Sequence, residues 1–563
     1  MAHVEQSSAV LRVLRTSSEV ARKGAARFRA IYFAGLGLIL SLFTIGGTMS
    51  MGFSNIDDHE RLGWVGPDGR VPTARLVDIL LSTEVGYVAT RCVGNAPCTR
   101  GRFRVVYYTF LIAETWLFGD SPTPYFTLRI GIFALFLAAV AWASGLALGY
   151  VAATALAIYV SSMKFWGGFW TYSLGAGEHV AILGFALVVI GAAQIVAHWY
   201  RRPSEKLNGP LGLMGLGTFI AMGSKENFFF LFGVFALCFA YGLRSRALSW
   251  PGFVLALAAL SACIALVAGE VVAFRLADAW GGDMKGLSLW GRFSIFWKSW
   301  RIGFPIAIVL IGLSMLFAWR HRWVQSRVGA TTRALTFGGA VAVICGLYSL
   351  WESFFYGGFG GGGAAARYAF PGLLIVPFGL GLMLFLIRVL ADAAPSSRAV
   401  RPVFYVATCL LVLVWPGHAW TFPVRAQVAS RVEQTARFAG DLARTADSVR
   451  EHPDWPLLVD VAALPYDKEA VTTLNLWLRR ARVRNTTVLR VRRINTGAPH
   501  GPFEEKLLRE MEKWAIDGAP GRYLPPDRIN QGAIARGECY VIALRLPSET
   551  TCTPVALHPE QYW

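Results

Sequence analysis

The chain has 563 residues and a formal net charge of +19, and its side chains are 55% hydrophobic but only 16% charged. A soluble globular protein carries about 25% charged residues, so this composition excludes a set of soluble domains and predicts a polytopic α-helical membrane protein. The positive charge then requires no nucleic-acid partner, because membrane proteins concentrate Lys and Arg in their cytoplasmic loops.

Apolar runs of about 20 residues, which are long enough to cross a bilayer core, recur along the chain. The first covers 31–52 and follows a basic segment. No small-residue cleavage site follows it, so we interpret it as an uncleaved anchor with a cytoplasmic N-terminus, 1–30. We expect about eleven spans, the others at 126–145, 146–163, 178–199, 209–224, 227–243, 252–274, 302–319, 334–352, 369–390 and 403–420.

The distribution of charge agrees with this topology. The N-terminus and the four loops expected on its side carry 18 Lys/Arg and four acids, whereas the first outside loop, 53–125, carries seven Arg and eight acids. Basic loops mark the cytoplasmic side. An odd number of spans then ends the membrane domain, 31–420, on the opposite side, so the tail, 421–563, is expected to face outward.

The tail has a different composition and is expected to form a small α/β domain, because strand-like and helix-like segments alternate in it. The expected helices are 424–450, 467–483 and 503–516, and the expected strands are 456–461, 486–491 and 539–544. Cys539 and Cys552 in the tail, and Cys92 and Cys98 in the first outside loop, form two close pairs that suit disulfides in an oxidising compartment. The remaining cysteines lie within apolar spans and are interpreted as packing residues: Cys238, Cys263, Cys345 and Cys409.

The densest group of chemically active side chains follows the first span directly, on the expected outside face. It reads Asp57-Asp58-His59-Glu60. A carboxylate held there by a helix end could act as a general base or bind a cation. An acidic loop that merely flanks a span is the alternative.

Two further polar groups interrupt apolar runs at the same face. Glu178-His179 opens the fourth expected span, and Lys225-Glu226 separates two others. Ionisable residues at membrane depth are costly and usually line a cavity or pathway. The alternatives are a helix-capping acid for Glu178 and a mutually neutralised pair for Lys225 and Glu226.

The fourth group at this face is a glycine-rich run, 356–363, followed by Arg367-Tyr368. Glycine amides can approach an anion closely, and an arginine suits phosphate. Carboxylates, a lysine and an arginine that converge at one face describe a site for an anionic amphiphile, such as a lipid phosphate whose attached group is transferred.

The order of these features resembles the GT-C superfamily of glycosyltransferases that use polyprenyl-phosphate sugars, especially the branch with the aminoarabinose transferases and protein O-mannosyltransferases. The resemblance covers about 30–390, and the motifs in order are Asp57-Asp58-His59-Glu60, Tyr107-Tyr108, Leu117-Phe118-Gly119-Asp120-Ser121, Arg129, Glu178, Lys225-Glu226 and Arg367-Tyr368-Ala369-Phe370-Pro371. The His-Pro-Pro that usually precedes the aromatic pair is replaced here by Phe103-Arg104-Val105-Val106.

The resemblance implies a role for each matched residue. Asp57 is expected to be the base, with Asp58 as a second candidate. Lys225 and Arg367 are expected to hold the lipid phosphate, and Glu178 the sugar or acceptor. Further substrate-binding candidates are His59, Glu60, Tyr107, Arg129, His179, Glu226 and Tyr368. No cofactor is assigned, and if a divalent cation is used, its expected ligands are Asp57, Asp58 and Glu60.

The sequence therefore predicts an integral glycosyltransferase of the plasma (inner) membrane. It would move a sugar from a polyprenyl-phosphate donor to a lipid, glycan or protein acceptor on the periplasmic or extracytoplasmic side. An O-antigen polymerase or ligase and a lipid or glycan transporter remain alternatives. A transporter is expected to show internal repeats and broken helices at the bilayer midplane, and we detect no repeat in the sequence.

Overall fold

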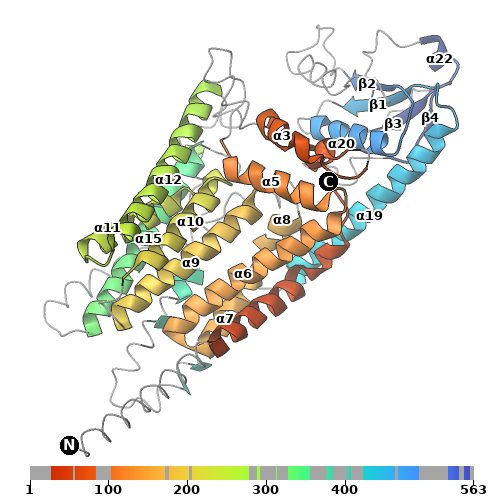
Figure 1. Cartoon of the computed structure of the whole chain (residues 1–563). Helices are drawn as coiled ribbons and strands as arrows, with labels where there is room; N and C mark the ends of the chain where they lie inside the picture. The colour runs from red at the N-terminus through yellow and green to blue at the C-terminus, as the bar shows by residue number, and fades with distance from the viewer. Residues whose placement is uncertain are drawn as a thin grey trace, which may run out of the picture.

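The structure is a computed structural model. It describes residues 27–54, 58–66, 68–83, 103–171, 177–201, 206–277, 327–355, 422–462, 467–492, 531–543 and 551–557, with scattered positions between 288 and 406. Within these residues, a bundle of long apolar helices occupies one end of the molecule and a small sheet with its own helices occupies the other (Figure 1).

The bundle begins with an unlabelled helix, Arg27–Ser50, whose last turn is the 3-10 helix η1 (Gly46–Ser50). At 1.5 Å per residue it is about 36 Å long, enough to cross a hydrocarbon core of roughly 30 Å. Among the described residues, five helical segments are long and apolar enough to cross a membrane. This helix is the first, and the other four are Pro122–Leu148, Glu178–Trp199, Glu226–Arg244 and Trp250–Glu270. We call the end of the bundle near Ser50 the outer end, and the end near Arg27 the inner end.

The labelled elements of this part form these spans, extend them or connect them. They are α2 (His59–Trp64), η2 (Thr73–Arg75), α3 (Leu76–Ser82), α5 (Val105–Phe118), α6 (Pro122–Leu148), α7 (Tyr150–Ser161), α8 (Phe165–Thr171), α9 (Glu178–Arg201), α10 (Asn208–Met222), η4 (Glu226–Phe228), α11 (Phe230–Arg244), α12 (Trp250–Ala277) and α15 (Arg327–Phe355). Helix α5 is a short apolar helix within the first outside loop and was not expected from the sequence.

Most expected spans correspond to a helix, but two of these helices are too short to cross a hydrocarbon core. Helix α7 has 12 residues and α10 has 15, so they extend about 18 and 22 Å, less than the hydrocarbon core. The break between α6 and α7 lies at Gly149, whose φ of 86° favours glycine. The expected span 334–352 lies within α15, while 302–319 and most of 369–390 and 403–420 lie outside the described residues.

Helices α9 and α10 pack with their backbones in close contact. A Cβ atom on Gly184 would lie 2.4 Å from the carbonyl oxygen of Gly217, and a Cβ atom on Gly217 would lie equally close to that of Gly184. Small residues at facing positions allow this approach between helices in a membrane. The packing holds the first turn of α9 beside the loop that follows α10, and both carry charged residues.

The tail contains a four-stranded parallel sheet in the order β2-β1-β3-β4. Its elements are α19 (Phe422–Arg450), β1 (Leu457–Ala462), α20 (Asp467–Arg480), β2 (Thr487–Arg492), α22 (Gln531–Ala535), β3 (Tyr540–Ala543) and β4 (Thr553–Pro554). Three strands and two helices therefore lie close to their expected positions. The expected helix 503–516 lies outside the described residues.

The expected disulfide between Cys539 and Cys552 is confirmed, with the two Cα atoms 4.7 Å apart. It joins the residue before β3 to the residue before β4. Cys238, Cys263 and Cys345 are free and buried, as expected for packing residues. The other expected pair, Cys92 and Cys98, lies outside the described residues, as does Cys409.

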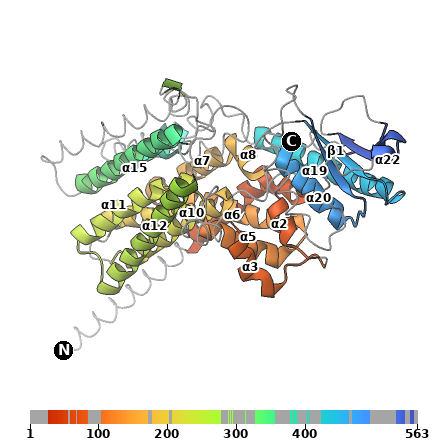
Figure 2. The same cartoon turned by 90° about the horizontal axis from the view of Figure 1, so that it is seen from above.

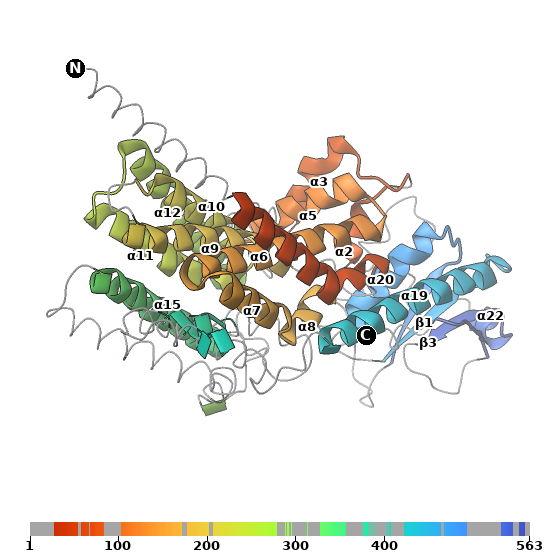
Figure 3. The same ribbon diagram turned by 90° about the horizontal axis from the view of Figure 1, so that it is seen from below.

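The tail packs directly on the outer end of the bundle. Leu476 of α20 is buried together with Met51 and Phe53, which follow the first helix, and with Leu62 of α2. Arg480 forms an ion pair with Asp120 in the loop before α6. Seen from above, α20 lies beside α2 (Figure 2), and seen from below, the start of α19 lies beside α8 (Figure 3).

The topology predicts which exposed positions a membrane-impermeant maleimide reaches in whole cells. Asp68, in the loop after α2, and Asp447, on α19, are both exposed and belong to the outer end. Arg244 is exposed at the inner end, where α11 ends. We expect Asp68→Cys and Asp447→Cys to be labelled from outside, and Arg244→Cys only after permeabilisation. Labelling of Arg244→Cys in intact cells would reverse the orientation.

Candidate active site at the outer end of the bundle

The first element of the site is the short segment between the first helix and α2. Asp58 precedes α2 and is only 1% exposed, and its Oδ2 accepts a 2.6 Å hydrogen bond from the backbone N–H of Ser54. The carboxylate is therefore enclosed by protein, unlike an acid of a loop that merely flanks a span. His59 and Glu60 form the first turn of α2, and Asp57 lies outside the described residues.

A buried ion pair joins α2 to α5. Arg61 donates from Nη2 to Glu114 Oε2 at 2.6 Å, and both side chains are almost completely enclosed. The Arg61 guanidinium also lies over the ring of Tyr125, 4.6 Å from its centroid, and the Tyr125 hydroxyl donates to the carbonyl of Gly119. The pair thereby fixes α2, α5 and the start of α6 relative to one another.

The pair explains the ionisation of Glu114. Burial by itself would raise the pKa of this carboxyl, but the Arg61 guanidinium, followed by His179 and Arg129, lowers the pKa to about 2. Burial likewise opposes the charge of Arg61, but Glu114 raises its pKa above the ordinary value. Both groups are therefore charged at neutral pH, and each depends on the other for compensation.

Arg129, on the second turn of α6, adds another cation to this enclosed region. It is 2% exposed, and its guanidinium lies over the ring of Phe126. Glu114 and Asp58 are near enough to stabilise its charge, and Arg61 near enough to oppose it. Neither terminal nitrogen of Arg129 has a hydrogen-bond partner within the part of the chain that the structure describes. These two donors are available to an anion.

The first turn of α9 brings two expected site residues into the same region. His179 Nε2 lies 3.6 Å from Glu114 Oε1, which is the carboxylate oxygen that does not accept from Arg61 Nη2. Glu178 Oε1 lies 3.2 Å from the ammonium of Lys225, which is in the loop after α10. All of these side chains are buried. Glu178 therefore does more than open a helix, because it compensates a buried lysine.

Glu226 has a different partner from its neighbour Lys225. Arg104, just before α5, donates to both carboxylate oxygens of Glu226 at 2.8 and 2.5 Å. The Tyr348 hydroxyl of α15 donates to the Glu226 backbone carbonyl. The alternative in which Lys225 and Glu226 merely neutralise each other is therefore wrong. Tyr107 is buried beside them, and its backbone N–H donates to the carbonyl of Gly223 at 3.2 Å.

Among the described residues, the cluster is charge-balanced. It holds four acids and four bases: Asp58, Glu114, Glu178 and Glu226 against Arg61, Arg104, Arg129 and Lys225. Within the described residues, no three His, Cys, Asp or Glu side chains gather closely enough to hold a metal ion. The proposed ligand Asp57, and the side chain of Glu60, lie outside the described part, so the divalent cation stays a prediction.

The structure thus brings together seven of the expected site residues and adds three. The seven are Asp58, Tyr107, Arg129, Glu178, His179, Lys225 and Glu226. Arg367 and Tyr368 lie outside the described residues. The added residues are Arg61, Arg104 and Glu114. An acid in the apolar run of α5 was a detectable signal for Glu114, because such residues rarely occur in apolar helices without a partner.

Comparisons with known proteins give little further information. No protein-family model matches the chain, and no curated protein matches it either. Among solved structures, the chain is similar to ArnT from Cupriavidus metallidurans, whose crystal structure has bound undecaprenyl phosphate. The identity is 14%, the match covers 88% of this chain and 93% of that chain, and the TM-score is 0.33. We therefore argue function from the residues of the cluster.

Removing one partner of the buried pair should destabilise the protein strongly. Glu114→Ala leaves the Arg61 charge without its main compensation, which typically costs about 3–5 kcal/mol. The double variant Arg61→Met/Glu114→Leu removes both charges and should recover most of that loss. Thermal unfolding in detergent measures both. Asp447→Ala, which breaks an exposed pair with Arg450, is the control and should change stability by about 1 kcal/mol at most. A Glu114→Ala variant as stable as the wild-type protein contradicts the assignment.

The same pair predicts a pH dependence. The pKa of Glu114 in the folded protein, about 2, is below its ordinary value of 4.5, so its stabilising contribution is complete above about pH 4.5 and is lost as the pH falls towards 2. The stability difference between the wild-type protein and Glu114→Ala should therefore be constant from pH 5 to pH 8 and shrink below pH 4. A difference that shrinks between pH 6 and pH 8 would point to a different titrating group.

Proposed function

We propose that the chain is an integral membrane glycosyltransferase that moves a sugar from a polyprenyl-phosphate donor to a lipid, glycan or protein acceptor. The reaction would occur at the outer end of the bundle, on the non-cytoplasmic side of the plasma membrane. The observation that carries this proposal is the enclosed cluster of charges around Arg129, because it combines carboxylates with a cation whose terminal donors have no protein partner within the described residues.

The position of the cluster suits a donor whose tail lies in the membrane and whose phosphate lies at the surface. It is formed where α6 and α9 begin and where α10 ends, all at the outer end. A buried cation interacts with an anion far more strongly than an exposed one, because water screens the interaction less. Arg129 is therefore the described residue best suited to bind the lipid phosphate, and its planar fork matches phosphate geometry.

Lys225 is the second cation proposed to bind the donor phosphate, and it already has a carboxylate partner. Its ammonium lies 3.2 Å from Glu178, so it would share its donors between that carboxylate and the donor phosphate. Arg367 stays a candidate for a further phosphate contact by the resemblance. In the reaction, an acceptor oxygen attacks the anomeric carbon while the sugar–phosphate bond breaks, and these cations would stabilise the negative charge that grows on the leaving phosphate.

The base is proposed to be Asp57 or Asp58. Asp58 has a carboxylate held by the Ser54 N–H at the start of α2, and its enclosure limits competition from water. Helix α20 of the tail packs on α2, so an acceptor would approach this carboxylate close to the tail. The remaining candidates, His59, Glu60, Tyr107, His179, Glu226 and Tyr368, would then contact donor sugar or acceptor.

Substitution of the aspartates tests this mechanism. Asp58→Asn keeps an oxygen that can accept from Ser54 N–H but removes the basic carboxylate, so the fold should persist. A positioned general base contributes about 10²–10⁴-fold, and either Asp57→Asn or Asp58→Asn should lose transfer by that factor. The measurement is recovery of the missing glycosylated product in a deletion strain that expresses each variant at matched levels.

Two further variants make the result specific. Asp68→Asn changes an exposed acid of the same outside loop and should retain full activity. Arg129→Gln should raise the donor concentration needed for half-maximal transfer more than it lowers the maximal rate. Wild-type transfer by both Asp57→Asn and Asp58→Asn would place the base elsewhere and overturn the proposal.

A further inference from the structure

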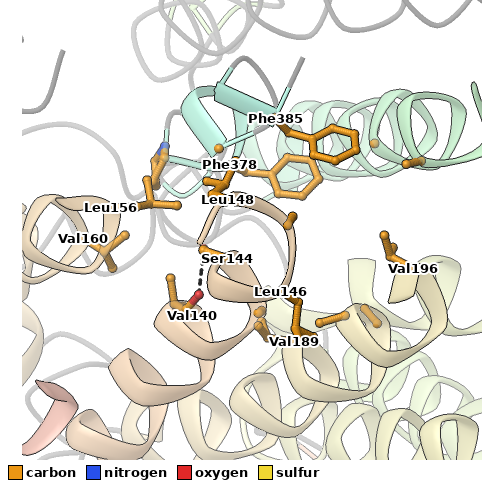
Figure 4. Close-up of a pocket in the computed structure, with 18 of the residues that line it drawn as sticks. Val140, Ser144, Leu146, Leu148, Leu156, Val160, Val189, Val196, Phe378 and Phe385 are labelled. Carbon is orange, nitrogen blue, oxygen red and sulfur yellow. Dashed lines mark hydrogen bonds between the residues drawn. The ribbon is translucent and has the colours of Figure 1, made fainter. Parts of the chain in front are cut away.

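A second feature of the bundle lies far from the charge cluster, in its inner half. An apolar cavity of about 510 Å³ is enclosed by α6, α7, α9, α15 and residues between 374 and 388. Phe378 and Phe385 lie on one side of it, and Val140, Leu146 and Val189 on the other (Figure 4). Its volume is within the range of about 300–1,000 Å³ that is typical of ligand sites.

The lining of this cavity suits a hydrocarbon chain. Ser144, the one hydroxyl residue among its described walls, donates to the carbonyl of Val140 at 2.7 Å, so its proton is already bound. Cavities with apolar walls exclude water and accept apolar ligands. The cavity is also partly open to the outside of the protein, which would allow a chain to enter from the bilayer.

One cation lies at this cavity. Among the described residues that line it, Arg388 is the one charged residue. Its Nη1 donates to the carbonyl of Ala147 at 2.7 Å, in the last turn of α6. This contact fixes the guanidinium at the inner end of the cavity, where α6 ends. An apolar cavity with a cation at the membrane surface is complementary to an acyl chain with an anionic headgroup.

A smaller neighbouring cavity has the same composition. It measures about 230 Å³ and lies on the other side of Phe337, a residue of α15 that lines both cavities. Its walls are mainly apolar, and Arg333 is the one charged residue among those that the structure describes there. The repetition of an apolar space with a single arginine, both in contact with α15, is consistent with a lipid-facing groove along this helix.

We propose that the larger cavity binds one acyl chain of an anionic phospholipid of the inner leaflet, with the headgroup phosphate at Arg388. Ser144 is 15 positions after Arg129 on α6, a distance of about 22 Å along the helix axis. The cavity is therefore separate from the outer charge cluster, and its lipid would be neither donor nor acceptor. A lipid wedged between α15 and the α6–α9 pair would instead hold these helices together.

Native mass spectrometry of the full chain in detergent tests the proposal with dioleoyl phosphatidylglycerol and dioleoyl phosphatidylcholine as probes. One arginine near a membrane surface typically favours an anionic lipid by roughly fivefold. The wild-type protein should retain one phosphatidylglycerol with that preference. Arg388→Gln, whose amide can still donate to Ala147, should lose the preference but still retain lipid.

Two variants and one competing lipid test whether the cavity itself holds the phospholipid. Ala193→Phe fills the cavity and should reduce retention of both lipids, whereas Arg244→Gln, an exposed arginine at the same inner end, should behave as the wild-type protein does. An unchanged preference in Arg388→Gln, or unchanged retention in Ala193→Phe, overturns the proposal. Displacement of phosphatidylglycerol by undecaprenyl phosphate in the wild-type protein also overturns it, because the cavity would then hold the tail of a polyprenyl lipid.

Discussion

The outer end of this molecule depends on the ion pair between Arg61 and Glu114. Two charges removed from water are costly unless each is compensated, and this pair meets that condition with a 2.6 Å contact and additional charges nearby. Its consequence is geometric. Arg61 is on α2 and Glu114 is on α5, so the pair fixes the segment that carries Asp58 against the start of α6, which carries Arg129. The proposed base and the proposed phosphate ligand are therefore positioned by the same contact.

The tail extends this constraint beyond the bundle. Helix α20 packs on α2 through Leu476 and Leu62, and Thr435 of α19 accepts a hydrogen bond from the Gly52 N–H just after the first helix. A single rigid helix, α19, therefore connects the bundle with the sheet. The tail thus packs on elements that carry the charge cluster, whose side chains are buried, and burial strengthens the electrostatic interactions among them. The tail is thus part of the proposed site, although its own residues do not supply the cluster's charges.

Much of this arrangement was accessible from the sequence, because it is encoded in local patterns. Apolar runs predicted α9, α11 and α12 to within three residues at each end, and strand-like segments of the tail predicted β1 and β2. The partners of the buried charges were not predictable in this way. Arg61 and Glu114 are 53 positions apart, and Arg104 and Glu226 are 122 apart, so only the packing of helices brings them together. The burial of Asp58 was missed for the same reason, because it precedes α2, on which α20 and α5 pack from distant parts of the chain.

The most direct test of the account is the position of a bound lipid phosphate. An electron cryo-microscopy structure of the full chain with undecaprenyl phosphate would show it. The account predicts a phosphate within hydrogen-bond distance, about 3 Å, of the terminal nitrogens of Arg129, with the Arg61–Glu114 pair intact. A phosphate bound elsewhere, with the charge cluster still closed around Arg129, would contradict the central claim that this cluster is the site of transfer.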